Sequence, residues 1–141
     1  MKRWLVKSDP DEYSAADLER DRQTAWTGVK NPLAQKHLQA MSPGDAVLVY
    51  HTGDEKAVVA TARVASAPRL DPAERSGRTN VVDLAFGAWL PKPVPLAEIK
   101  ADPFFRDFAL VRMSRLSVMP VSDEQWKRLL EMAGGETSRR G

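Results

Sequence analysis

Cysteine is absent from the 141-residue chain, which excludes disulfides, thiolate metal sites and a cysteine nucleophile. Long apolar runs are absent too, because no stretch approaches the roughly 20 residues that a membrane span requires. The first residues, Met1 to Trp4, lead directly into a strand-like run and contain no signal-peptide core. We therefore expect no membrane partner and, in the absence of an export signal, a cytoplasmic location.

The sequence also lacks the common catalytic signatures. It has two histidines, His37 and His51, on different predicted elements and without a nearby carboxylate motif. Metalloprotease, serine-hydrolase, P-loop and Rossmann patterns do not occur. We therefore predict no catalytic residue, no metal ligand and no cofactor. His37 lies at the edge of a predicted apolar helix face and is interpreted as structural, whereas a functional role for His51, at the end of a buried strand, stays open.

Charge and size fit a small binding domain. The net charge is +2, and 43% of the residues are hydrophobic and 28% charged, which is an ordinary globular balance. This charge permits a nucleic-acid partner without requiring one. We predict one domain over residues 1–135, followed by a disordered tail over 136–141, and a monomer.

The stretch from Ala25 to Ala34 forms an unusual junction. Asn31 followed by Pro32 predicts a helix start, with Asn31 as the N-cap and Pro32 at the first helical position. Gly28 permits a positive φ or a close backbone approach. Trp26 stands just before this start, where it is either a core residue or a stacking wall for a planar ligand. Our hypothesis is that Trp26 supplies stacking rather than core support.

Hydrophobic periodicity predicts the remaining elements. Strands are expected over 4–8, 46–50, 58–64, 81–86 and 116–121, with an extended segment over 91–95. Helices are expected after Ser14 and Ser122, which begin capping boxes with Asp17 and Gln125, after Asn31, and over 96–100. Phe104, Phe105 and Phe108 are interpreted as a core plug, and Asp9, Asp11 and Glu12 as turn and cap residues. This order favours an α+β fold with a mixed, strongly curved sheet.

Aromatic residues in or beside the predicted strands alternate with basic residues. Stacking of a base on such a ring is worth about 1–3 kcal/mol and tolerates any base. Selectivity would then come from hydrogen bonds at the base edge. The residues concerned are Trp4, Trp26, Tyr50 and Trp89 among the aromatics, and Lys7, Lys30, Arg63 and Arg112 among the basic residues.

Five segments, in this order along nearly the whole chain, resemble the EVE domain, a member of the PUA-like superfamily related to the YTH readers of methylated RNA. They are 4–14, the pattern Trp26-x-Gly28-Val29-x-Asn31, 44–51, 91–96 and 109–121. The resemblance implies a curved sheet closed into a partial barrel, with helices packed around it. It also implies a pocket for a flipped, modified base of DNA or RNA, or for a free modified nucleoside.

The same resemblance assigns residues to that pocket. Trp26 and Tyr50 would form its walls, and a polar edge and a mouth would surround them. The polar edge would consist of Lys7, Ser8, Gly28, Val29, Asn31 and His51, and the mouth of Arg112, Leu116 and Ser117. The chain departs from the family pattern at Thr52 and in the short loops 53–56 and 69–78, so the choice between DNA and RNA stays open.

We predict a non-enzymatic reader of modified bases with modest affinity, because a charge of +2 provides few phosphate contacts. Two alternatives stay open. ASCH domains share the PUA-like architecture, and some hydrolyse acylated cytidine with Lys, Thr and Glu. Lys7 and Thr24 or Thr27 match two of those residue types, but no glutamate follows at the family spacing. The other alternative is an interaction module that holds a metabolite.

Overall fold

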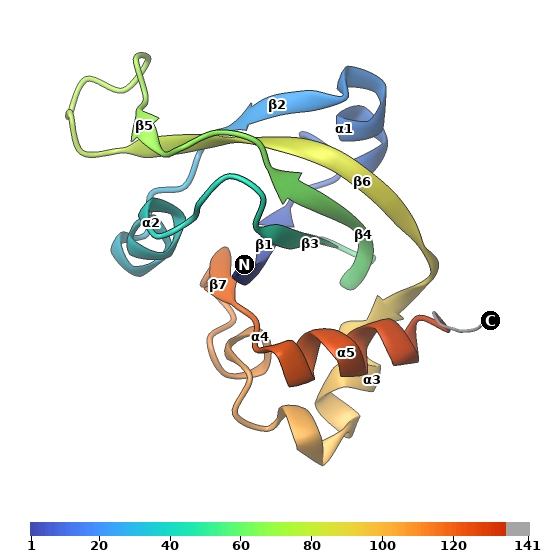
Figure 1. Ribbon diagram of the computed structural model, residues 1–141. Helices are drawn as coiled ribbons and strands as arrows, with labels where there is room; N and C mark the ends of the chain where they lie inside the picture. The colour runs from blue at the N-terminus through green and yellow to red at the C-terminus, as the bar shows by residue number, and fades with distance from the viewer. Residues whose placement is uncertain (135–141) are drawn as a thin grey trace.

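The computed structural model describes residues 1–134, which form a mixed sheet with helices around it (Figure 1). Gly135 and the predicted tail over 136–141 lie outside the described residues. Within residues 1–134 the sheet has seven strands, in the order β2-β6-β4-β3-β1-β7, with β5 paired to β6. Their bounds are β1 Arg3–Ser8, β2 Gln23–Trp26, β3 Ala46–His51, β4 Ala57–Val64, β5 Arg69–Leu70, β6 Asn80–Pro95 and β7 Val118–Pro120.

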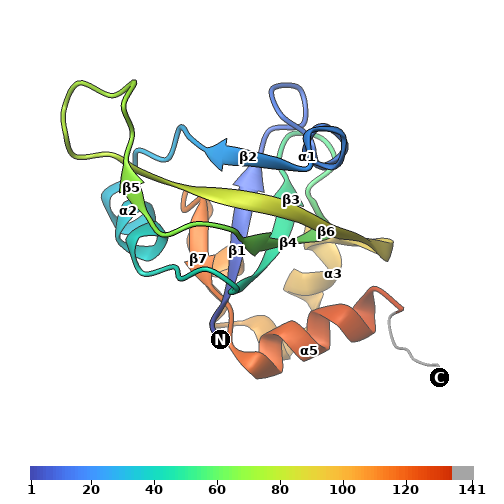
Figure 2. The ribbon, with the colours of Figure 1, turned by 45° about the horizontal axis from the view of Figure 1, so that its top comes forward.

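Strands β1 and β3 lie side by side and are parallel, whereas the other pairs are antiparallel (Figure 2). The apolar run of β3 is buried, as expected for a strand covered on both faces. In the parallel register, Lys7 pairs with Tyr50 and Ser8 with His51. Because parallel strands end at the same edge of a sheet, the polar ends of β1 and β3 meet there.

Strand β6 curves the sheet into a partial barrel. It pairs with β2 through its first half and with β4 along most of its length, and two register shifts interrupt the β4 pairing. Such bulges bend a strand and increase its twist. At Gly87 a Cβ would lie 2.7 Å from Thr61 Oγ1, so the bend requires glycine there. The predicted segments 81–86 and 91–95 are therefore parts of one strand.

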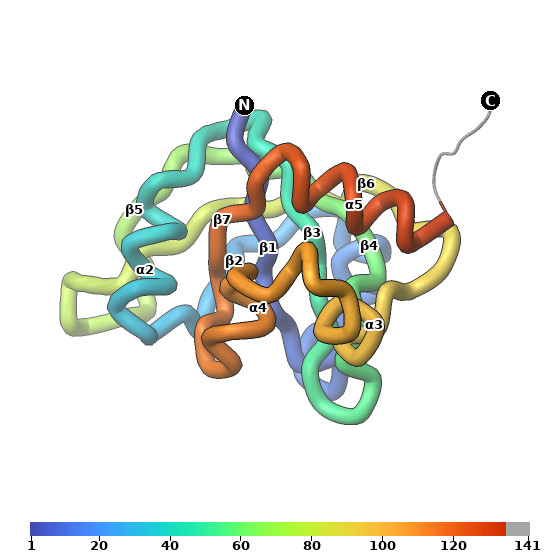
Figure 3. Tube along the Cα trace, turned by 90° about the horizontal axis from the view of Figure 1, so that it is seen from below, coloured from blue at the N-terminus to red at the C-terminus, as the bar shows by residue number. Residues whose placement is uncertain are grey.

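The helices are α1 Ala15–Asp21, α2 Pro32–Gln39, α3 Leu96–Ala101, α4 Ala109–Arg112 and α5 Asp123–Met132, with a short 3₁₀ turn, η1, at Pro103–Phe105. Both predicted capping boxes are confirmed, at Ser14 and at Ser122. Helices α3, α4 and α5 lie together on one side of the sheet (Figure 3). No helix within residues 1–134 is long and apolar enough to cross a membrane.

Strands β2 and β7 and one core residue also differ from the prediction. The segment Gln23–Trp26 is a strand, although no strand was predicted there and the predicted junction begins at Ala25, and the expected strand 116–121 is shorter, at Val118–Pro120. Phe105 and Phe108 are buried as predicted, but Phe104 is wrong as a core residue because it is 45% exposed. The turn η1 points Phe104 outward, where the guanidinium of Arg128 lies 5.1 Å from its ring centroid.

Candidate nucleic-acid interface

The end of β1, the loop before α1 and the end of β2 enclose a hollow of about 340 Å³. We call it the aromatic hollow. It brings together four of the predicted pocket residues, Lys7, Ser8, Trp26 and Gly28, and adds residues from the loop and from β2. The full lining is Lys7, Ser8, Asp9, Glu12, Tyr13, Thr24, Ala25, Trp26, Thr27 and Gly28.

Trp26 and Tyr13 are the two aromatic residues of this hollow. Their rings stand at 84° with centroids 6.2 Å apart, an edge-to-face arrangement. Tyr13 donates a hydrogen bond to Asp21 Oδ2 at 2.9 Å. Burial and then that carboxylate raise the pKa of Tyr13 above its usual value. Trp26 is only 7% exposed and belongs to the core, so the hypothesis that it supplies stacking rather than core support needs correction.

The loop that follows β1 is tied by its own hydrogen bonds. Ser8 Oγ donates to the carbonyl of Tyr13, and the carbonyl of Asp9 accepts the N–H groups of Glu12 and Tyr13. Asp9 Oδ1 accepts the N–H of Asp11 at 2.9 Å, which confirms its predicted turn role. These bonds fix the backbone of the loop, and the loop contributes two acidic residues, Asp9 and Glu12, to the lining. The sequence analysis did not assign Glu12 or Tyr13 to the pocket, although the turn before the Ser14 cap places both beside β1.

Lys7 separates the aromatic hollow from a second hollow that contains Tyr50. Its ammonium donates to the carbonyl of Ser114 at 2.9 Å and lies 5.7 Å from the ring centroid of Tyr50. Burial lowers the pKa of Lys7 and raises the pKa of Tyr50. Trp26 and Tyr50, the predicted walls of one pocket, therefore line hollows on different sides of Lys7.

His51 is a structural anchor behind this region. It is buried, and its Nε2 accepts the N–H of Ala15, the first residue of α1, at 3.0 Å. The proton of the neutral ring is therefore on Nδ1, which donates to Glu55 Oε1 at 2.7 Å. Through these contacts His51 fixes the start of α1 relative to β3. His37 is half-buried, and its ring centroid lies 6.2 Å from that of Trp4, which fits its predicted structural role.

Asn31, Arg112 and Leu116 line a third hollow, of about 360 Å³, with Leu33, Met113, Ser114 and Arg115. Asn31 Oδ1 accepts the N–H of Ala34 at 3.0 Å, which confirms the predicted N-cap. Val29 is buried, and its carbonyl accepts the amide of Gln35.

Ser117 contributes its carbonyl, which accepts the N–H of Lys7 at 2.9 Å. The structure thus distributes eight of the eleven predicted pocket residues over three hollows, whereas Val29, His51 and Ser117 line none of the three. The first two share Lys7, and the second and third share Ser114. In the described part of the chain, no group of three or more His, Cys, Asp or Glu side chains is arranged to hold a metal ion.

Comparison with known proteins identifies related chains. The sequence model of the EVE domain matches residues 2–132. A protein from Rhodopseudomonas palustris, solved by NMR, is 39% identical and superposes with a TM-score of 0.90, over 95% of this chain and 94% of that one. These similarities, together with the sheet topology, confirm the predicted α+β class with a mixed, curved sheet.

Two of the related chains are human, and one of them was solved with a ligand. Human thymocyte nuclear protein 1 is 26% identical over 170 residues, which cover 96% of this chain and 75% of that protein. The crystal structure of human THYN1 in complex with DNA containing 5-methylcytosine superposes with a TM-score of 0.85 at 22% identity, over 97% of this chain and 100% of that one. At that identity the superposition demonstrates a shared fold.

Proposed function

This chain belongs to the EVE domain family, and from that membership we propose that it binds nucleic acid carrying a modified base, by taking the base into the aromatic hollow. The observation that carries the proposal is the aromatic hollow itself, where two aromatic rings stand beside polar and charged groups at one edge of the sheet. The DNA complex of human THYN1 supports DNA with a methylated cytosine as the polymer to test first.

The lining offers both kinds of hydrogen-bond partner that a base edge requires. Asp9 and Glu12 carry acceptors for an exocyclic amine, and Thr24 and Thr27 carry hydroxyl donors for a ring nitrogen or carbonyl oxygen. Stacking on an aromatic ring adds about 1–3 kcal/mol. Extrusion of a base costs a few kcal/mol and least in single strands, so these contacts suffice to hold a base taken from single-stranded DNA.

A second candidate function is hydrolysis of an acylated nucleoside, as in some ASCH domains. The sequence spacing provided no glutamate partner for Lys7, but folding brings Glu12, Thr24 and Thr27 into the same hollow as Lys7. Against this candidate, the ammonium of Lys7 is hydrogen-bonded to the carbonyl of Ser114. That bond positions Lys7 as a charged donor and leaves it poorly placed to accept a proton.

We expect saturable binding without turnover. Wild-type protein would be incubated with 5-methyl-2′-deoxycytidine and with N4-acetylcytidine, and the mixtures analysed by calorimetry and mass spectrometry. The expected result is a binding isotherm for the methylated nucleoside and no new mass from either compound, because Lys7 is already engaged.

Lys7→Ala and the exposed Lys127→Ala are the paired variants for this experiment. A product that forms with wild-type protein and Lys127→Ala, but not with Lys7→Ala, would establish the hydrolase instead. If wild-type protein bound neither nucleoside and no methylated oligonucleotide, the proposed function as a reader of modified bases would be overturned.

A further inference from the structure

The second hollow, of about 310 Å³, lies between the β3–β4 turn, helix α3 and the segment around Ser114. We call it the lysine hollow, because three lysines, Lys7, Lys56 and Lys100, contribute to its lining. The other lining residues are uncharged: Tyr50, Thr52, Gly53, Leu96, Leu110, Val111 and Ser114.

The fold holds these lysines on three different elements. Lys7 is the last residue but one of β1, and its ammonium donates to the carbonyl of Ser114. The carbonyl of Lys56 accepts the N–H of Leu96 at 2.8 Å, which joins the β3–β4 turn to the first residue of α3. Lys100 follows Leu96 by four residues and therefore projects from the same helix face. The three lysines thus line one hollow although they come from different elements.

The positive charge of this hollow is not compensated by ion pairs. Within residues 1–134, Lys56 and Lys100 form no ion pair, although other surface cations do, such as Lys30 with Glu74 at 2.8 Å and Arg69 with Asp83 at 2.9 Å. Lysines that converge around an apolar floor, with no carboxylate in the lining, attract a multivalent anion. The lowered pKa of Lys7, caused by burial, accords with an ammonium that lacks a counter-charge.

The two hollows that Lys7 separates differ in charge. The aromatic hollow contains Asp9 and Glu12, which repel an anion, whereas the lysine hollow contains cations alone among its charged residues. A nucleotide has the same division, because its base is neutral and its phosphate is anionic. Tyr50, Leu96 and Leu110 also line the lysine hollow and offer apolar surface on which the C–H groups of a deoxyribose can pack.

We propose that the lysine hollow binds the phosphate group of the nucleotide whose base enters the aromatic hollow. This inference rests on the proposed function. The shared chemistry is a phosphate ester, which is supplied either by the backbone of a DNA strand or by a free nucleotide.

The test compares ligands with and without phosphate on two proteins, wild type and the double variant Lys56→Gln/Lys100→Gln. The ligands are 5-methyl-2′-deoxycytidine, its 5′- and 3′-monophosphates, and a single-stranded oligonucleotide with one 5-methylcytosine. For ligands that carry phosphate, the double variant should lose about five- to tenfold in affinity, since two charge-assisted contacts disappear. Its affinity for the nucleoside should stay unchanged, and its salt slope for the oligonucleotide should fall by about 0.7 per lost contact.

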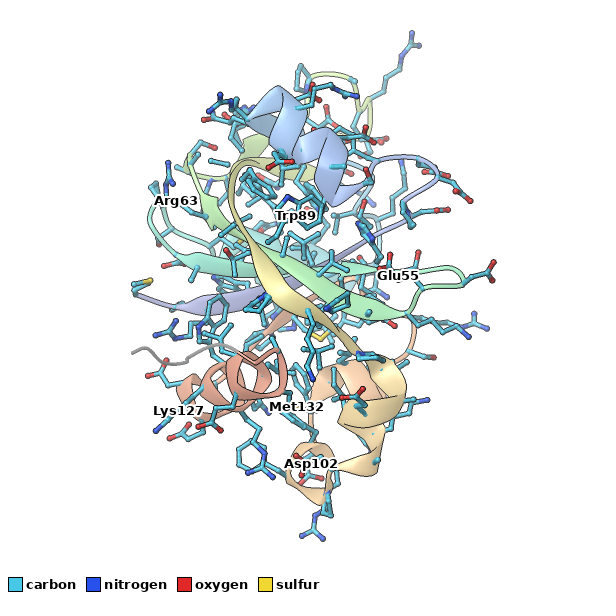
Figure 4. All side chains as sticks on the ribbon, turned by 90° about the vertical axis from the view of Figure 1, so that its right-hand side faces the viewer. Glu55, Arg63, Trp89, Asp102, Lys127 and Met132 are labelled. Atoms are coloured by element: carbon cyan, nitrogen blue, oxygen red, sulfur yellow. The ribbon has the colours of Figure 1, made fainter. Side chains whose placement is uncertain are left out.

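Lys127→Gln is the matched control, because Lys127 is an exposed lysine on α5, well away from the β3–β4 turn that Glu55 marks in Figure 4. The phosphate site would be overturned, and the proposed reader left intact, by either of two results. One is an equal loss of affinity in the control and the double variant, and the other is an equal loss of affinity for the nucleoside and the monophosphates in the double variant. Failure of wild type to bind the nucleoside and the oligonucleotide would overturn both. If wild type bound one monophosphate more tightly than the nucleoside, but bound the oligonucleotide no more tightly, the site would be assigned to free nucleotides.

Discussion

Trp26→Ala is expected to lower the free energy of unfolding by about 3–5 kcal/mol, the usual cost of truncating a buried tryptophan. Trp26 is 7% exposed and belongs to the core, and it is also a lining residue of the aromatic hollow. For a domain of this size the loss corresponds to a decrease in Tm of roughly 10–15 °C. The same variant should lose about 1–3 kcal/mol of base binding, since the ring no longer supports the base. Thermal melts and calorimetric titration measure the two effects.

Trp26→Phe separates the two roles of this residue. Phenylalanine retains an aromatic ring and part of the buried volume, so its Tm should lie between those of wild type and Trp26→Ala. Binding is compared at a temperature at which all three proteins are folded, as judged by circular dichroism. If folded Trp26→Ala bound the methylated nucleoside with wild-type affinity, the base would not contact this hollow.

Asp45→Ala is expected to cost about 3 kcal/mol or more, because it removes the acceptor of three N–H groups. The buried carboxylate of Asp45 accepts Trp4 Nε1–H and the backbone N–H groups of Lys2 and Ser42, each at 3.0 Å. These bonds join β1 to the turn before β3. Chemical denaturation should give the loss, and Asp45→Asn, which retains one oxygen acceptor, should lose less. Equal stability of Asp45→Ala and wild type would show that water replaces the carboxylate.

The same carboxylate predicts acid sensitivity. Burial alone would raise the pKa of Asp45, but the hydrogen bonds from Trp4, Ser42 and Lys2 outweigh it, and the folded-state pKa is lowered. A lowered folded-state pKa contributes stability above the unfolded-state pKa of about 4, and this contribution is lost as the pH falls through the folded-state value. Wild type should therefore lose more stability than Asp45→Ala between about pH 4 and pH 2.

Local signals predicted much of the fold. The capping boxes at Ser14 and Ser122 and the N-cap at Asn31 depend on residues within one helical turn, so their spacing in the sequence was sufficient. The buried strand β3 was equally clear from its continuous apolar run.

Long-range features were not predictable in this way. Strand β2 is defined by its pairing with β6, about 60 residues later in the chain, and no local pattern within Gln23–Trp26 indicates that pairing. Likewise, β6 is one strand because β4 pairs with both of its halves. Phe104 looked like a core residue by composition, but its direction is set by the turn η1.

The resemblance assigned eleven residues to one pocket, and four of them, Lys7, Ser8, Trp26 and Gly28, line the same hollow. Trp26 and Tyr50 line different hollows, and Lys7 lines both. The ammonium of Lys7 contacts Ser114, which lies 107 residues away in sequence, and no spacing rule predicts such a contact.

The most direct measurement is an NMR titration of the wild-type protein with two single-stranded oligonucleotides. One contains a single 5-methylcytosine, and the other has an abasic site at that position. The account predicts that amide signals of Trp26, Thr27 and Gly28 shift with the methylated strand only, whereas signals of Gly53, Lys56 and Ser114 shift with both. Identical shifts of the first group with the abasic strand, or shifts confined to other surfaces, would contradict entry of the base into the aromatic hollow.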